Sequence, residues 1–234
     1  MTPPDHFADS REAVLKARAL LRQAHAVIFD FDGTLADTSK GVLDSVEYAL
    51  EKMGAPSFDR RVLRGFIGPS LYESFQTITG LTPEDSVRAI EYYRSYYQPK
   101  GIYECNLYPE MKELLKELSD KGVCLSVASS KPQVSLDVVT KHLGIDGFFD
   151  KIVGAELSVK TSDKLTLVKR AALNENNVMV GDAVFDVRAA HAAGFTSVAV
   201  TYGFYDRETL EKEKPDFIAD SVSEIREVIN KICF

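Results

Sequence analysis

AVIFDFDGTLADT, residues 26–38, joins a buried strand to a pair of acidic residues. Its four apolar residues, 26–29, show no alternation, which is typical of a strand covered on both faces. Asp30 ends this run, and Asp32 follows beside Gly33. A buried carboxylate costs several kcal/mol unless it is paired or bound to a cation. Ligands of open parallel sheets bind beyond the carboxyl ends of the strands, so a metal site is expected at Asp30 and Asp32.

Apolar segments of strand length recur along the rest of the chain. They span residues 123–128, 151–154, 178–181, 197–201 and, as a possible short sixth strand, 217–219. Helical patterns separate these segments, and strands separated by helices pair in parallel through right-handed crossovers. The sequence therefore predicts the α/β class, with a Rossmann-like parallel sheet.

The segment after the first strand contains helical patterns only. Apolar residues recur at spacings of three and four from Leu43 to Met53, and Gly54 follows as a helix stop. A second helix is predicted to begin at Thr82-Pro83 and to end before Pro99. We therefore expect an all-helical insertion at 37–104 in a core made of 1–36 and 105–234. A further helical pattern at 9–23 receives no chemical role.

Charge and composition limit the possible partners. The 234 residues carry 28 basic and 35 acidic side chains, hence a formal charge of −7, which argues against nucleic acid and anionic membranes as partners. No apolar run has the ~18 residues of a membrane span, and the N-terminus lacks a leader pattern. Three widely spaced cysteines predict reduced thiols. We expect a cytoplasmic monomer or homodimer.

A second pair of acids follows a later strand, in Gly181-Asp182-Ala183-Val184-Phe185-Asp186. Asp182 lies at the strand end, where it would face the site beside Asp30. Asp186 falls in the first turn of the next helix, where a carboxylate also complements the helix dipole. The roles of helix cap and site residue are compatible at this position.

The stretches at 30–35 and 181–186 resemble the first and fourth motifs of the haloacid dehalogenase superfamily, in its phosphatase branch. The resemblance implies that the insertion at 37–104 is the helical cap over the active site. It also implies a Mg²⁺ ion bound by the Asp30 carboxylate, the Asp32 backbone carbonyl and the Asp182 carboxylate. Asp186 would support this shell. Few carboxylates, completed by water and substrate oxygens, suit Mg²⁺.

The same resemblance suggests two phosphate-binding residues. Ser129 stands where the family has a hydroxyl that binds a phosphoryl oxygen, although a serine at a strand end is often only a turn former. Lys164 is expected in the first turn of a helix capped by Ser162, where its charge opposes the helix dipole. Many family members have Lys-Pro where this chain has Lys164-Leu165, so Lys160 remains an alternative.

The implied reaction is phosphomonoester hydrolysis in two steps. Asp30 attacks phosphorus to form an aspartyl-phosphate, and Asp32 protonates the leaving oxygen and later takes a proton from water. The presence of Asp32 disfavours a dehalogenase. A sugar phosphomutase and a non-catalytic phospho-switch protein both remain alternatives.

The expected substrate is a small soluble phosphorylated metabolite. The cap segment 66–71, with Gly68-Pro69, looks like the cap loop of phosphoglycolate phosphatases and of related small-molecule and nucleotide phosphatases. Phosphoglycolate is therefore expected ahead of a nucleoside 5′-monophosphate. Arg60, Arg61 and Arg64 flank the loop, where one of them would bind a substrate carboxylate or a second phosphate, or all would form a solvated face. The tyrosines of 92–97 form i,i+4 pairs and receive no site role.

Overall fold

The predicted strands form one parallel sheet, in the order β5-β4-β1-β6-β7-β8. The computed structural model describes residues 25–156 and 163–234. The predicted helix at 9–23 and the residues Lys160 and Ser162 lie outside the described part. From one edge of the sheet to the other, the strands are β5 (Lys151–Ala155), β4 (Cys124–Pro132), β1 (Ala26–Phe29), β6 (Asn177–Gly181), β7 (Thr196–Val200) and β8 (Phe217–Ala219).

β1 lies in the middle of the sheet, with β4 on one side and β6 on the other. Ala26 is in register with Cys124 of β4 and with Asn177 of β6, and both pairings are parallel. The carboxyl ends of these three strands therefore meet at one edge. Asp30 follows β1 at this edge and Asp182 follows β6.

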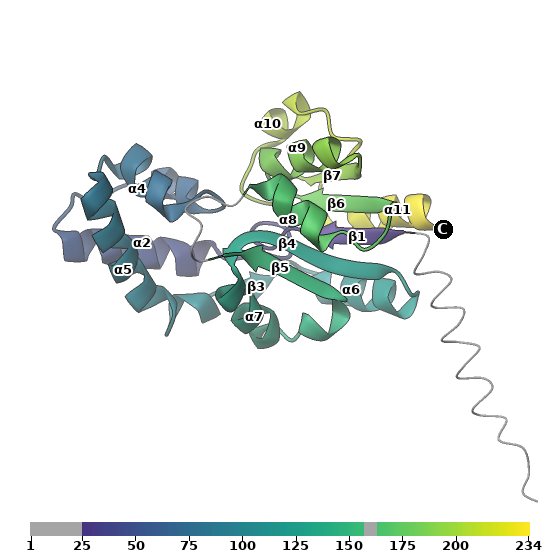
Figure 1. Cartoon of the computed structure of the whole chain (residues 1–234), viewed down its shortest axis with the longest axis horizontal. Helices are drawn as coiled ribbons and strands as arrows, with labels where there is room; N and C mark the ends of the chain where they lie inside the picture. Colours follow the sequence, from purple (N-terminus) through teal and green to yellow (C-terminus); the bar gives the residue numbers. More distant parts are fainter. Residues whose placement is uncertain (1–24, 157–162) are drawn as a thin grey trace, which may run out of the picture.

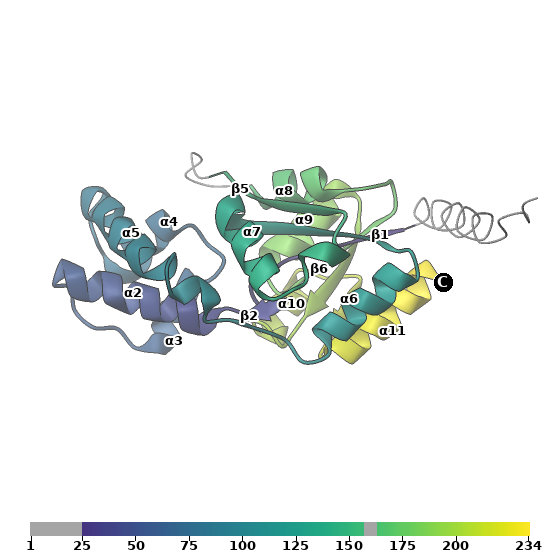
Figure 2. The same ribbon diagram turned by 90° about the horizontal axis from the view of Figure 1, so that it is seen from below.

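Helices cover both faces of the sheet, so that β1 is buried on each side. Val27 and Phe29 belong to a cluster shared with α6 (Met111–Asp120), α7 (Gln133–His142) and α11 (Val222–Cys233). Ile28 belongs to a second cluster, with α8 (Lys164–Ala171) and α9 (Val184–Ala193). Figure 2 shows α6 and α11 on one face and α8 and α9 on the other. This two-sided burial is the reason the strand lacks alternation.

Shorter elements complete the core. They are η3 (Asp146–Phe148), α10 (Arg207–Lys212) and the antiparallel pair β2 (Ala36–Asp37) with β3 (Asn106–Leu107). The sequence did not predict this pair, because a two-residue strand is too short to show alternation. This pairing joins the chain segment that leads into the helices after β2 to the segment that leads out of them.

The segment between β2 and β3 is helical, as predicted. It contains α2 (Ser39–Met53), α3 (Arg60–Leu63), η1 (Arg64–Phe66), α4 (Leu71–Thr79), α5 (Pro83–Tyr97) and η2 (Gly101–Tyr103). Gly54 ends α2 in the left-handed conformation, with φ 65°. The Thr82 side chain accepts a hydrogen bond from the Asp85 N–H at the start of α5. In Figure 1 this helical group lies beyond the carboxyl ends of β1 and β4.

Within residues 25–156 and 163–234, no helix is both long and apolar enough to cross a membrane.

Candidate active site

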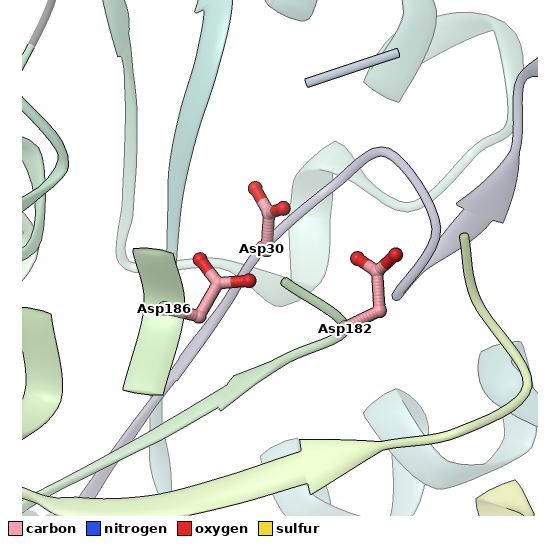
Figure 3. Close-up of side chains that lie close together, drawn as sticks. All are labelled: Asp30, Asp182 and Asp186. Atoms are coloured by element: carbon pink, nitrogen blue, oxygen red, sulfur yellow. The ribbon is translucent and has the colours of Figure 1, made fainter. Parts of the chain in front are cut away.

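Three buried carboxylates converge at the carboxyl edge of β1 and β6. Asp30, Asp182 and Asp186 each offer one oxygen, and these oxygens lie within 4.8 Å of one another. Figure 3 shows the three side chains around one space, Asp30 after β1, Asp182 after β6 and Asp186 from α9. Each residue is at most 8% exposed. One acid of the first predicted motif and both acids of the second are therefore brought together, across a separation of more than a hundred residues.

Lys164 is the cation beside this cluster. Its Nζ lies 2.8 Å from Asp30 Oδ1 and 2.8 Å from Asp186 Oδ1, and it donates a 2.9 Å hydrogen bond to the Ala128 carbonyl. Burial alone would lower the pKa of the ammonium, but the charges of Asp186 and Asp30 raise it above its ordinary value. Lys164 is therefore charged and holds Asp30 in place. The N-cap of its helix is Asp163, whose side chain accepts from the Thr166 N–H.

Burial also controls the Asp30 carboxyl. It raises the pKa of Asp30 to about 7, with Lys164 opposing this shift and Asp186 adding to it. An attacking carboxylate has to be ionised, so a further positive charge near Asp30 would favour the reactive form.

Asp182 is fixed by two donors. The Thr34 hydroxyl donates to its Oδ1 at 3.1 Å and the Phe204 N–H to its Oδ2 at 2.8 Å. Burial nevertheless raises the pKa of Asp182, and the charges of Asp30 and Asp186 raise it further. Gly33, with φ +86°, leaves the room this carboxylate needs, because a Cβ there would overlap it.

These residues fit a magnesium ion. Three buried carboxylates against one ammonium leave an excess of negative charge, which a divalent cation would offset. All the donors are oxygens, the ligands that Mg²⁺ prefers. Asp30, Asp182 and Asp186 are the side chains that would hold it. The Asp186 Oδ2 also accepts from the Ala183 N–H, so the helix-capping and site roles coexist.

Asp32 points its side chain into a different set of contacts. Its Oδ1 lies 2.9 Å from Lys131 Nζ and accepts a 2.6 Å hydrogen bond from the Thr38 hydroxyl. Lys131 Nζ also donates to the Tyr97 hydroxyl at 3.0 Å. Sequence reasoning assigned no site role to these three partners. The backbone carbonyl of Asp32 as a metal ligand stays a prediction.

Ser129 lies near the end of β4 and is 1% exposed. Its hydroxyl accepts a 3.2 Å hydrogen bond from the Lys131 N–H, two residues on, which is a local turn contact. Ser129 also lines the cavity described next. The position of Ser129 is compatible with both predicted roles, as a turn former and as a phosphate ligand.

A cavity of about 860 Å³ lies between the helical segment and the sheet edge. The acids, Ser129, Lys131 and Lys164 line it on the core side, and α5 and the 66–71 loop line it opposite them. Much of the remaining wall is apolar. Three of its side chains, Val87, Val134 and Phe185, are about half exposed. Gly68 in the loop has φ +100°, which explains a glycine before Pro69.

The basic residues flanking this loop do not line the cavity. Arg60 forms ion pairs with Asp44 and Glu47, and Arg61 pairs with Asp59. All three arginines are exposed, which favours the solvated-face alternative, and contact of one of them with a substrate carboxylate or second phosphate stays a prediction. Arg94 of α5 lines the cavity instead. Arg94 and Tyr97 are three residues apart and so share one face of α5, and both line the cavity. The helical spacing in the sequence would have placed Arg94 beside Tyr97, but not over the acids.

The fold and this acidic, lysine-containing edge define an α/β enzyme site that handles anions. Residues 27–200 match the family model described as "Haloacid dehalogenase-like hydrolase", so the chain belongs to the haloacid dehalogenase-like hydrolases.

Several relatives of this chain are named as a nucleotidase or as phosphatases. A 5′-nucleotidase of Pseudomonas aeruginosa is 31% identical, over 87% of this chain and 94% of that protein. A phosphoglycolate phosphatase of Vibrio vulnificus is 31% identical, over 87% and 95%. The crystal structure of a predicted phosphatase from Clostridium acetobutylicum superposes with a TM-score of 0.83, at 35% identity, covering 89% of this chain and 99% of that one. The predictions of the family, its phosphatase branch and the α/β fold are confirmed.

Proposed function

We propose that this chain is a Mg²⁺-dependent phosphomonoesterase that acts on a small phosphorylated metabolite through an aspartyl-phosphate. The observation that carries this proposal is the convergence of Asp30, Asp182, Asp186 and Lys164 on one cavity between the sheet edge and the helical segment. When bound, Mg²⁺ would screen the charge between Asp30 and an anionic phosphoryl group.

Asp30 is the proposed nucleophile. Lys164 holds one of its oxygens at 2.8 Å, which limits rotation of the carboxylate and favours its charged form. Attack forms a bond between a carboxylate oxygen and phosphorus while the bond from phosphorus to the leaving oxygen breaks. Ser129 and Lys164 would donate to the phosphoryl oxygens.

Asp32 is the proposed acid and base. It gives its proton to the leaving oxygen in the first step. In the second step it takes a proton from the water that attacks the aspartyl-phosphate, so phosphate is released and both aspartates return to their starting state. Asp32 lines the cavity and lies two residues from Asp30, which supports this division of roles.

Residues 37–104 are the proposed cap, with residues 1–36 and 105–234 as the hydrolase core. The α5 helix and the loop at 66–71 line the cavity on the side opposite the acids, which supports a role for them in limiting the access of water during the reaction. The cap would then contribute to substrate choice, together with the core side chains Val134 and Phe185 that line the same cavity.

Phosphoglycolate is the first candidate substrate. The phosphoglycolate phosphatase relative supports it, and Arg94 is a cavity-lining guanidinium that suits a substrate carboxylate.

A nucleoside 5′-monophosphate is the second candidate, favoured by the cavity itself. A volume of about 860 Å³ exceeds the needs of a two-carbon acid, and the half-exposed Val87, Val134 and Phe185 offer an apolar wall to a base. A 5′-nucleotidase is also among the relatives.

The test is phosphate release from a panel of phosphoglycolate, nucleoside 5′-monophosphates, sugar phosphates and p-nitrophenyl phosphate, with Mg²⁺ and with EDTA. We expect multiple turnover that needs Mg²⁺ and is lost in Asp30→Asn. Stoichiometric labelling without turnover would support a phospho-switch protein. Return of the phosphoryl group to the same sugar, without release to water, would support a phosphomutase.

A further inference from the structure

Lys131 is a buried lysine that the proposed reaction leaves without a role. It follows Ser130 near the carboxyl end of β4, and its side chain is 6% exposed. Burial alone would lower the pKa of its ammonium, but the charge of Asp32 and the hydroxyls of Tyr97 and Tyr93 raise it well above its ordinary value. A lysine buried with its charge needs partners that hold it there.

Those partners come from two parts of the chain that are separate from the strand of Lys131. Lys131 Nζ lies 2.9 Å from Asp32 Oδ1, in the loop after β1, and 3.0 Å from the Tyr97 hydroxyl, at the end of α5. The rings of Phe31 and Tyr97 lie 5.8 Å and 5.3 Å from the ammonium. One ammonium thus connects the sheet, the first acidic loop and the cap helix.

The contacts on Asp32 fall on one of its two oxygens. Lys131 and the Thr38 hydroxyl both meet Oδ1, the latter at 2.6 Å. Two contacts on Oδ1 restrict rotation of the carboxylate. No hydrogen bond from residues 25–156 or 163–234 reaches Oδ2, which is left to exchange a proton with the leaving group. Tyr97 is 6% exposed and stacks on Tyr93 at 5.2 Å between ring centroids, so its hydroxyl is fixed by the packing of α5.

We propose that Lys131 is a positioning residue for the acid Asp32, and that Tyr97 makes this positioning depend on the docked place of the cap helix α5. The inference rests on the proposed function, since it gives Asp32 its task there. Proton transfer to the leaving oxygen is then efficient only when α5 lies over the site, which couples acid catalysis to an enclosed substrate.

The test compares an alkyl phosphate, whose leaving oxygen needs a proton, with p-nitrophenyl phosphate, whose leaving oxygen needs it much less. In Lys131→Met we expect kcat for the alkyl ester to fall about 10- to 100-fold, part of the ~10²- to 10⁴-fold worth of general acid catalysis. The loss for p-nitrophenyl phosphate should be several-fold smaller, and KM for both esters should change little.

Tyr97→Phe keeps Lys131 and the ring stack and removes only the hydroxyl, so it covers the case in which Lys131→Met fails to fold. We again expect kcat to fall more for the alkyl ester than for p-nitrophenyl phosphate, but by less than in Lys131→Met. The matched control is Tyr96→Phe. Tyr96 is the neighbouring residue of α5, and its hydroxyl also contacts a lysine, Lys100, but on the outer surface. In this control, kcat for both esters should stay close to that of the wild type.

A double-mutant cycle separates positioning from direct phosphate binding. If Lys131 acts only through Asp32, then Asp32→Asn with Lys131→Met turns over the alkyl ester no more slowly than Asp32→Asn alone. Equal losses on both esters with a raised KM, or losses that multiply in the Asp32→Asn background, would overturn the inference and assign Lys131 to the phosphoryl group. A wild-type enzyme inactive on both esters would instead refute the proposed function.

Discussion

Asp30→Asn is expected to stabilise the metal-free protein while it abolishes turnover. The ordinary pKa of 3.8 rises to about 7 in the folded chain, chiefly because the carboxyl is buried. The folded state therefore binds more protons than the unfolded state between about pH 4 and pH 7, and the free energy of unfolding falls as pH rises through this window. Above about pH 7, Asp30 is charged in both states, and the free energy of unfolding is lowered by the full cost of burying that charge.

The size of the effect follows from the shift. Each pKa unit corresponds to ~1.4 kcal/mol, so near pH 7.5 the charged Asp30 lowers the stability of the metal-free fold by on the order of 4 kcal/mol. Asparagine keeps the shape and a hydrogen-bonding oxygen for Lys164 without the charge. For a chain of this length, the melting temperature should rise by roughly 10 °C.

The assay is thermal unfolding in EDTA between about pH 5 and pH 8, followed by the same series with Mg²⁺. The variant should show a shallower pH dependence than wild type and a smaller stabilisation by Mg²⁺. The control is Asp120→Asn, because Asp120 pairs with Lys116 at the surface and its side chain is 61% exposed, so a change within about 0.5 kcal/mol is expected. An Asp30→Asn variant that is less stable than wild type in EDTA would refute the electrostatic account of the cluster.

Three further changes test other parts of the site. Asp32→Asn should slow alkyl phosphates by ~10²- to 10⁴-fold and p-nitrophenyl phosphate far less, and equal losses would remove Asp32 from the acid role. Gly33→Ala places a Cβ against a site carboxylate at φ +86°, so we expect weaker Mg²⁺ binding and a loss of about 1 to 3 kcal/mol of stability, whereas Gly147→Ala, with open space around it, should change neither. Arg94→Met should raise KM about 10-fold or more for phosphoglycolate but not for p-nitrophenyl phosphate, with the surface variant Arg88→Met as control; unchanged KM for phosphoglycolate would exclude a carboxylate contact.

The sequence predicted the parts of the site that follow from strand ends. Asp30 and Asp182 each close an apolar run, and parallel strands bring such ends to one edge whatever the loops between them do. Lys164 was predicted from the family resemblance, with Lys160 as an alternative, and an anion or acid beside it offsets the unfavourable place of a cation in the first turn of a helix. The N-cap of α8 is Asp163, one residue after the predicted Ser162. Both residue types are good N-caps, so the sequence alone does not separate these two neighbours.

The contacts around Asp32 could not be predicted in this way. Lys131 and Tyr97 are 34 residues apart, and their hydrogen bond depends on where α5 docks, which no local pattern specifies. Nor does a cluster of arginines reveal which of them have acidic neighbours in space. Arg60 forms ion pairs with Asp44 and Glu47 of α2, so its charge is already paired on the outer side of the helical segment.

Acid quenching of the enzyme during turnover, followed by peptide mass spectrometry, tests the proposed nucleophile most directly. With Mg²⁺ and a substrate in excess, we predict one phosphoryl group on the peptide that contains Asp30, formed at least as fast as phosphate is released. The label should be absent in Asp30→Asn and should persist longer in Asp32→Asn, because the attacking water then lacks its base. Full phosphate release with no phosphoryl group on Asp30, or with the group on another residue, would contradict the account.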